Sequence, residues 1–238
     1  MRVASSCVVT LSALLAGALL GVTPVQAATD AATDAATEAA TSGSVVDLAG
    51  LDPAIFARAR LAFERIRASG LHAVRPVLAV IDYSLPSTAQ RMWVFNVDTG
   101  ALLHHERVAH GRGTGALYAT RFSNRHGSHQ SSLGTFVVGD AYRGKHGRSL
   151  RLHGLDRGLN DNALARAVVI HAADYVTDAV VKVQGRLGRS WGCPALDPAV
   201  AHDVMDTLED GAVLVAWHRD QPALLQSPWL RSERLALR

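Results

Sequence analysis

Short apolar runs separated by turn residues, with few helical patterns between them, most constrain how this chain can fold. The runs that we interpret as strands are residues 77–82, 91–97, 101–109, 133–139, 149–152, 168–170 and 212–217. Asp98-Thr99-Gly100 is a turn signal that joins two of them as a hairpin. Because these strands follow one another directly instead of alternating with helices, we expect a mainly β fold, an antiparallel β-sandwich or barrel with peripheral α-helices.

Two segments at the ends of this β region have the pattern of capped helices. Asp52-Pro53 offers an N-cap and a first-turn proline, apolar residues follow at helical spacing, and Gly70 ends the pattern. Asp197-Pro198 repeats the same opening, and Gly211 stops the second pattern. We expect both helices to contribute packing and no chemistry.

Composition fits one globular domain and argues against nucleic-acid binding. The chain has 238 residues, of which 48% are hydrophobic and 19% charged, which is enough to bury a sizeable core. Its formal net charge of +3 suits an anionic polymer or surface, but no run of Lys and Arg marks a nucleic-acid site. We therefore expect no nucleic-acid partner.

Residues 1–27 have the pattern of a secretory signal peptide. Arg2 gives a positive start, residues 7–22 form an apolar stretch, and Val25-Gln26-Ala27 resembles a cleavage site. The apolar stretch is too short for a transmembrane helix, so we expect no transmembrane anchor. This pattern predicts an exported protein, and we expect a periplasmic location because the segment that follows carries no lipid site or sorting signal.

The segment after the predicted signal peptide differs in composition from the rest of the chain. Near-repeats of T-D-A-A fill much of residues 28–50, and nothing in them can build a core. We interpret this segment as a flexible linker. Residues 51–238 then form a single domain.

Cleavage after Ala27 would leave Cys193 as the only thiol, because it removes Cys7. An unpaired cysteine in an exported protein has an intermolecular partner or is a reactive free thiol. A buried, inert cysteine is the alternative, but a Gly and a Pro flank Cys193 and place it on a turn. His171 follows the apolar run 168–170, so a thiol and an imidazole are both present. The imidazole can take the thiol proton, or hold it as imidazolium beside a thiolate.

Two other features of the sequence are candidate sites. His104, His105 and His110 lie on the predicted hairpin, but they lack carboxylate or thiolate partners at ligand spacing, so we expect no metal and no cofactor. Residues 111–132 are rich in Gly, Ser, Arg and His and form a long irregular segment, which is typical of a functional loop.

The stretch 168–196 resembles the catalytic domain of L,D-transpeptidases of the YkuD type. That family's signature is a His, a spacer and then S-x-G-C, which here are His171 and Ser190-Trp191-Gly192-Cys193. The segments that resemble its murein L,D-transpeptidase branch, which has Cys-Pro-Ala after the nucleophile, are 131–139, 142–152 and 158–163. The resemblance spans about residues 50–218, so it identifies 51–238 as an L,D-transpeptidase-like catalytic domain.

The resemblance implies a reaction on peptidoglycan stem peptides. Cys193 would attack the carbonyl between an L-centre and a terminal D-amino acid, which leaves with a proton from His171. The thioester would pass to an amine of a second stem, or to water in an L,D-carboxypeptidase. A third hypothesis is a non-catalytic wall-binding module that uses Lys182, Arg186 and Arg189 as a basic surface. The presence of both Cys193 and His171 argues against it.

The remaining site residues are expected around the nucleophile. Backbone N–H groups at Gly192 and Cys193 are candidates for stabilising an oxyanion. Ser190 is a turn hydrogen-bonder or a catalytic hydroxyl, and Tyr175 and Trp191 line a substrate groove or pack. Many family members have His where this chain has Trp191. Many also have an Arg two residues after the Cys, where this chain has Ala195, and Arg189 is the candidate that could replace that cation.

Overall fold

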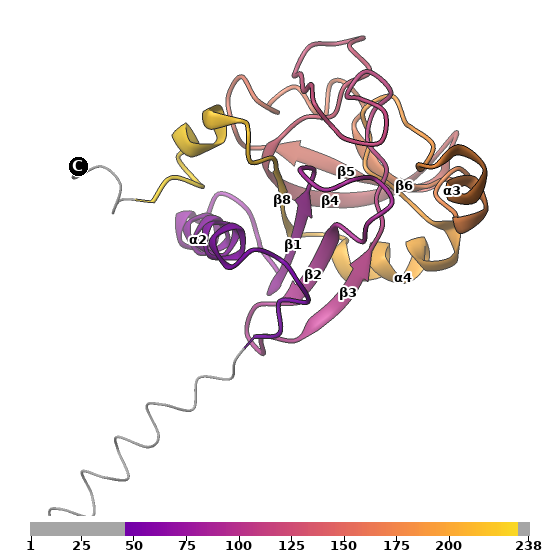
Figure 1. Ribbon diagram of the computed structural model, residues 1–238. Helices are drawn as coiled ribbons and strands as arrows, with labels where there is room; N and C mark the ends of the chain where they lie inside the picture. Colours follow the sequence, from indigo (N-terminus) through magenta and orange to yellow (C-terminus); the bar gives the residue numbers. More distant parts are fainter. Residues whose placement is uncertain (1–45, 233–238) are drawn as a thin grey trace, which may run out of the picture. The chain divides into compact units, whose positions relative to one another are not determined.

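A strongly bent sheet forms the centre of the protein in this computed structural model, which describes residues 46–232 (Figure 1). The predicted signal peptide at 1–27, most of the predicted linker at 28–50 and the last six residues of the predicted domain lie outside the described residues. The strands are β1 (Val77–Asp82), β2 (Met92–Asn96), β3 (Leu102–Glu106), β4 (Gly134–Gly144), β5 (Gly147–Gly154), β6 (Val169–Ala172), β7 (Ala195–Leu196) and β8 (Val213–Trp217). They form one 8-stranded sheet in the order β3-β2-β1-β8-β4-β5-β6-β7.

Most neighbouring strands are antiparallel, as the sequence predicts. The two exceptions are β1 with β8 and β6 with β7, which pair in parallel. Parallel neighbours need a crossover connection, and β8 comes from the far end of the domain to lie between β1 and β4. The mainly β prediction is therefore confirmed, with a mixed sheet in place of a purely antiparallel one.

The two ends of the sheet approach each other. Ala109, just after β3, forms an antiparallel bridge with Ala195 of β7, and its N–H donates to the Ala195 carbonyl at 2.9 Å. This contact makes the sheet barrel-like. It also brings the segment after β3 to the same edge as Cys193, which is separated from β7 by Pro194.

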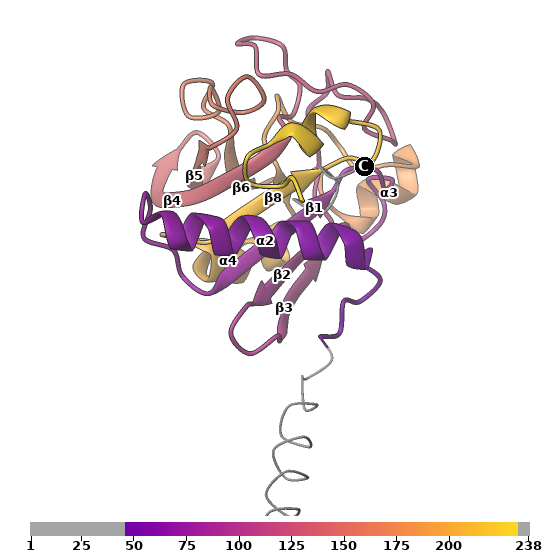
Figure 2. The ribbon, with the colours of Figure 1, turned by 90° about the vertical axis from the view of Figure 1, so that its left-hand side faces the viewer.

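Helices lie on both sides of the sheet. They are α2 (Pro53–Ser69), α3 (Asp178–Gln184), α4 (Pro198–Leu208) and the 3₁₀ helix η1 (Pro222–Gln226). α2 packs on β1 and β8, while α4 lies on the opposite side against β6 and β1 (Figure 2). Asp52 and Asp197 cap α2 and α4 by accepting from Ala54 N and Ala199 N, as the sequence predicts. None of the helices between residues 46 and 232 is long and apolar enough to cross a membrane.

Residues at the end of the predicted linker contact the domain. Trp93 Nε1 donates to the Ala49 carbonyl at 3.1 Å, and the side chains of Val46 and Leu48 pack against the core. Among the described residues, contacts with the domain therefore begin a few residues before the predicted boundary at 51.

The histidines of the predicted hairpin have structural contacts. His104 Nε2 lies 2.8 Å from Thr207 Oγ1, His105 stacks on Trp93, and His110 Nδ1 lies 2.8 Å from buried Arg91. Among the residues that the structure describes, no group of three or more His, Cys, Asp or Glu side chains could hold a metal ion.

Replacing buried Asp156 by Ala is expected to lower the free energy of unfolding by about 2–4 kcal/mol. Its carboxylate accepts from Thr135 N at 2.6 Å and from Ser227 Oγ at 2.5 Å, so it joins β4 to the C-terminal segment. Removing it leaves a buried N–H without its acceptor. Urea unfolding measures the loss, and exposed Asp161→Ala is the control, for which less than about 1 kcal/mol is expected. Equal losses in the two variants would contradict this role.

Candidate active site

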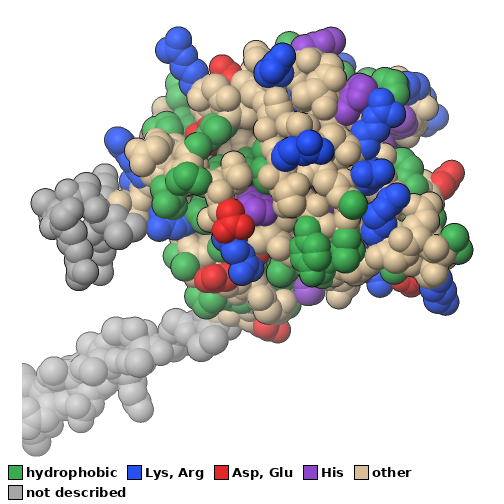
Figure 3. All heavy atoms as spheres, turned by 45° about the horizontal axis from the view of Figure 1, so that its top comes forward, with side chains coloured by type: hydrophobic (Ala, Val, Ile, Leu, Met, Phe, Trp, Pro, Cys, Tyr) green, Lys and Arg blue, Asp and Glu red, His purple; other side chains and the backbone are tan. Residues whose placement is uncertain are grey.

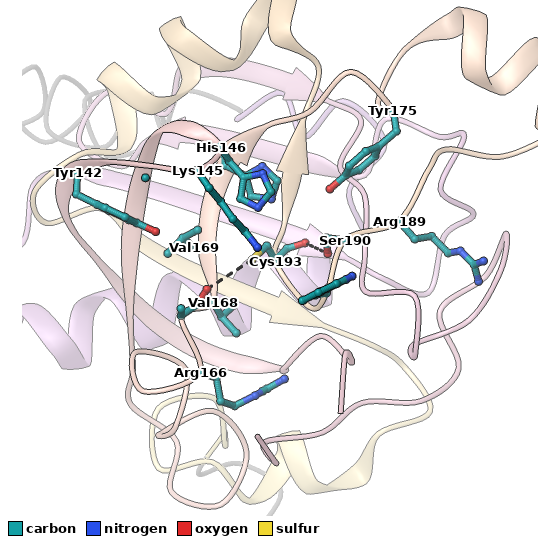
Figure 4. Close-up of a pocket in the computed structure, with 14 residues that line it drawn as sticks. Tyr142, Lys145, His146, Arg166, Val168, Val169, Tyr175, Arg189, Ser190 and Cys193 are labelled. Carbon is teal, nitrogen blue, oxygen red and sulfur yellow. Dashed lines mark hydrogen bonds between the residues drawn. The ribbon is translucent and has the colours of Figure 1, made fainter. Parts of the chain in front are cut away.

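A cavity of about 660 Å³ lies beside β6 and the turn that carries Cys193 (Figure 4). Its lining consists of Tyr142, Gly144, Lys145, His146, Arg166, Ala167, Val168, Val169, His171, Tyr175, Arg189, Ser190, Trp191 and Cys193. Every site residue proposed from the sequence is present except Gly192. No carboxylate side chain is in this set, so its charged groups are cationic.

Parallel pairing of β6 with β7 brings the two candidate catalytic residues to one edge of the sheet. His171 lies opposite Ala195 in the register, and Cys193 precedes Ala195 by two residues. The apolar residues Val169 and Ile170 anchor β6 in the interior. Strand pairing therefore brings the thiol and the imidazole to the same edge although they are far apart in the sequence.

The nucleophile turn, residues 190–193, is held by hydrogen bonds of its own. Ser190 Oγ donates to the Cys193 carbonyl at 2.6 Å and accepts from Gly192 N at 3.0 Å. This hydroxyl therefore acts as both a hydrogen-bond donor and an acceptor inside the turn. The Gly192 N–H, which the sequence offers as an oxyanion donor, is engaged by Ser190.

The loop at residues 111–132 supports the nucleophile turn from behind. Ser131 Oγ donates to the Gly192 carbonyl at 3.0 Å and accepts from Gly111 N at 3.0 Å. Ser190 N donates to the His110 carbonyl at 3.0 Å, and Arg112 N donates to the Ser190 carbonyl at 2.8 Å. This irregular segment acts as a scaffold for the turn.

Arg166 ties the same loop to the rim of the cavity. Its guanidinium donates to the Gln130 carbonyl at 2.6 Å and to the Ser123 carbonyl at 2.7 Å. The next residue, Ala167, has a positive φ of 53°, which is uncommon for a residue with a Cβ. This geometry turns the Ala167 carbonyl toward the thiol.

His171 is almost fully buried, at 1% exposure, and its orientation is set on two sides. Nδ1 lies 2.8 Å from the Ala172 carbonyl, which can only accept, so Nδ1 carries the hydrogen and Nε2 has a free lone pair. The His146 ring stacks on the imidazole with centroids 4.4 Å apart and planes 20° apart. A backbone carbonyl is thus the group that orients His171.

Electrostatics favour a neutral thiol and a neutral imidazole at rest. Burial raises the pKa of Cys193 and outweighs the opposing effects of the Val169 N–H, Arg166, Lys145 and the Cys193 N–H. Burial also lowers the pKa of His171, although its hydrogen bond to the Ala172 carbonyl acts the other way. Accordingly, the Cys193 thiol donates to the Ala167 carbonyl at 3.7 Å. Of the two proton arrangements left open by the sequence, the structure favours the neutral one.

Tyr175, Trp191 and Arg189 form part of the rim. Tyr175 is half-buried, and burial raises the pKa of its phenol to about 12. Trp191 is 60% exposed, and its ring lies 5.3 Å from the Arg112 guanidinium carbon. Arg189 Nη1 donates to the Gly115 carbonyl at 2.8 Å. All three can contact a ligand in the cavity.

Sequence reasoning missed Lys145, His146 and Arg166. Gly144-Lys145-His146-Gly147 between two strands is a recognisable hairpin turn, and Gly147 has a left-handed φ of 76°. Nothing in the local pattern indicates that this turn covers Cys193, because that placement depends on the pairing of β5 with β6.

Replacing Gly192 by Ala is expected to reduce acylation of Cys193 by about 10²-fold. Gly192 has φ 127°, and an added Cβ would lie 2.7 Å from the Gln130 carbonyl, so the turn must shift. The rate of adduct formation with an acylating β-lactam, followed by intact mass, measures the effect. Gly70→Ala is the matched control, because Gly70 also has positive φ, 64°, but nothing lies within 4 Å of its Cβ position. A normal rate in the Gly192 variant would show that the turn tolerates displacement.

Several solved structures are similar to this chain at low sequence identity. An L,D-transpeptidase from Mycobacterium smegmatis is 18% identical with a TM-score of 0.36, covering 60% of this chain and 58% of that one. LD transpeptidase LdtMt1 in complex with imipenem is 17% identical with a TM-score of 0.36, covering 58% and 57%. The L,D-transpeptidase from Xylanimonas cellulosilytica is 14% identical with a TM-score of 0.35, covering 61% and 62%. The chain thus spans about three fifths of the length of each of these structures.

The family comparison covers most of the domain. No curated protein matches the chain. The family model described as L,D-transpeptidase catalytic domain matches residues 47–217, from just before α2 to the last residue of β8. This range contains both β-strands of the candidate site and the whole nucleophile turn. The chain therefore belongs to the L,D-transpeptidase catalytic domain family.

Proposed function

We propose that this protein is a peptidoglycan L,D-transpeptidase in which Cys193 is the nucleophile and His171 the general base. The observation that carries the proposal is the shared cavity, where a turn-borne thiol and an imidazole with a fixed tautomer line one space. A cysteine nucleophile needs a base in reach and an orienting group behind that base. Here the Ala172 carbonyl is that orienting group.

Acylation begins from the neutral pair. His171 Nε2 takes the thiol proton while Cys193 Sγ bonds to the carbonyl carbon of the stem-peptide L,D bond. The backbone N–H groups of Cys193 and Val169, both of which lower the pKa of the thiol, are the candidate donors to the oxyanion. The C–N bond then breaks, His171 gives its proton to the leaving amine, and a D-amino acid departs. Cys193 is left as a thioester.

Deacylation transfers the stem to an acceptor. An amine of a second stem attacks the thioester carbonyl and gives a proton to His171, which returns it to the Cys193 sulfur as the C–S bond breaks. The product is a crosslinked dimer. Water in place of the amine gives a shortened stem, which is the L,D-carboxypeptidase outcome. Lys and Arg side chains gather along one edge of the face in Figure 3, where Asp and Glu side chains are few, and this suits an anionic wall polymer.

The experiment uses a purified tetrapeptide stem as donor, with and without a second stem as acceptor, and identifies products by mass spectrometry. Release of a D-amino acid with formation of a dimer supports the transpeptidase. Release with only a shortened stem supports the hydrolase. No release, with no adduct on exposure to imipenem, contradicts both and favours a non-catalytic wall-binding module.

The acylation rate is expected to rise with pH to a plateau whose midpoint lies below the ordinary histidine pKa of 6.5. Only neutral His171 can accept the proton, and burial lowers the pKa at which it becomes neutral. Alkylation by iodoacetamide requires thiolate, so its rate is expected to keep rising beyond the ordinary cysteine pKa of about 8.5. Both profiles are measured by intact mass. An alkylation rate already at its plateau below neutral pH would indicate a thiolate–imidazolium pair instead.

We place this activity outside the cytoplasm, in the periplasm, because peptidoglycan lies there and residues 1–27 have the pattern of a signal peptide. The intact mass of protein recovered from a periplasmic extract tests this. Loss of residues 1–27 is the expected result, and an unprocessed chain retained in the cytosol would contradict it.

A further inference from the structure

The side chains that line the cavity include several cations and no carboxylate. Two of these cations already donate hydrogen bonds to other parts of the protein. Arg166 donates to the Gln130 and Ser123 carbonyls and also to serine hydroxyls of the same loop. Arg189 Nη1 donates to two backbone carbonyls, those of Gly115 and Arg112. These guanidinium groups therefore have structural partners before any ligand enters.

Lys145 differs from both arginines. Among the described residues its ammonium group makes no hydrogen bond or ion pair, and its contact is with the Trp191 ring, whose centroid lies 4.9 Å from Nζ. The hairpin turn between β4 and β5 presents this exposed side chain, and Figure 4 shows it reaching from the turn toward Cys193. Its positive charge lowers the pKa of Cys193 and of His171. Lys145 thus places an uncommitted cation beside the reacting atoms.

We propose that Lys145 binds the free α-carboxylate of the D-amino acid that leaves, and so selects donors that end one residue after the cleaved bond. This inference rests on the proposed function. The carboxylate carbon of that residue is three bonds from the attacked carbonyl carbon, hence within about 4 Å of it. The Lys145 side chain, which reaches from the hairpin turn toward Cys193 in Figure 4, is therefore placed to meet this carboxylate. Contact with the aromatic ring of Trp191 holds the ammonium group over the nucleophile turn.

The test compares two donors that differ only in charge at the C-terminus. One is a tetrapeptide stem with a free C-terminal acid, and the other is the same peptide as a C-terminal amide. The wild-type chain is expected to prefer the acid by on the order of ten- to a hundredfold in kcat/KM, the range of a charge-assisted hydrogen bond. Lys145→Met is expected to remove this preference mainly by lowering kcat/KM for the acid. Lys145→Arg is expected to keep most of it.

The ratio of kcat/KM for the acid donor to kcat/KM for the amide donor separates recognition of the carboxylate from effects that act on both donors. Lys145 also lowers the pKa of Cys193, but any change in thiol reactivity acts on both donors and cancels in the ratio. Lys182→Met, on exposed α3 outside the cavity, is the matched control and is expected to leave the ratio unchanged. Arg189→Met tests whether Arg189, instead of Lys145, binds the carboxylate.

The possible outcomes separate this inference from the function on which it rests. An unchanged ratio in Lys145→Met overturns the inference, as does a ratio that collapses only in Arg189→Met. Absence of any preference in the wild-type chain, with a D-residue still released from both donors, overturns it too and leaves the transpeptidase intact. No release from either donor by the wild-type chain overturns the proposed function and this inference together.

Discussion

Replacing Cys193 by Ala is expected to abolish acylation, with a fall in rate on the order of 10⁴-fold or more. The covalent step needs a sulfur that can attack a carbonyl, and Cys193 is the free cysteine of the part of the chain that the structure describes. Intact mass after incubation with imipenem measures the result directly. A single adduct is expected on the wild-type chain and none on the variant.

Stability separates loss of the nucleophile from loss of the fold. The Cys193 thiol makes one weak hydrogen bond, to the Ala167 carbonyl, so its removal is expected to change the free energy of unfolding by less than about 1 kcal/mol. Cys193→Ser is a second control, because a hydroxyl fits the site but is a poorer nucleophile under the same base. An adduct that persisted on the folded Ala variant would show that another group is acylated and would end the assignment.

Replacing His171 by Asn is expected to reduce the acylation rate by about 10³-fold, within the range for loss of a general base. The Asn amide nitrogen can still donate to the Ala172 carbonyl as Nδ1 does, but nothing remains at the position of Nε2 to take the thiol proton. The acid limb of the pH profile should disappear in this variant, because the group that titrates is gone. The measurement is the β-lactam adduct rate as a function of pH.

His171→Gln is the matched comparison, since its amide reaches the ε position but cannot make the same contact with Ala172. Asn is therefore expected to preserve stability better than Gln, while both lose the acid limb. An acid limb retained in His171→Asn would assign the titration to another group. His146, which stacks on His171, would then be the first to test.

Local patterns determined much of the fold. Asp52-Pro53 and Asp197-Pro198 predict the starts of α2 and α4, because capping depends on residues adjacent in the chain. The predicted strands match β1 and β8 closely, since continuous apolar runs must be buried. α3 and β7 were missed: α3 is a short helix with no buried residue, and β7 has two residues, so neither leaves a periodic signal.

In the candidate site, too, some features follow from local sequence and others depend on tertiary structure. Cys193, His171 and the Gly-rich turn could be predicted from residue type and order, because a candidate nucleophile and a candidate base are recognised by their own chemistry. The Ala172 carbonyl belongs to the residue next to His171. The Ser131 contact with Gly192 and the position of the turn that carries Lys145 depend instead on segments far apart in the chain. Only the pairing of β5 with β6 and of β6 with β7, and the folding of the 111–132 loop against the nucleophile turn, bring them together. The pKa shifts of the pair depend on tertiary structure as well, because burial is a property of the packed fold and it raises the pKa of Cys193 while it lowers that of His171.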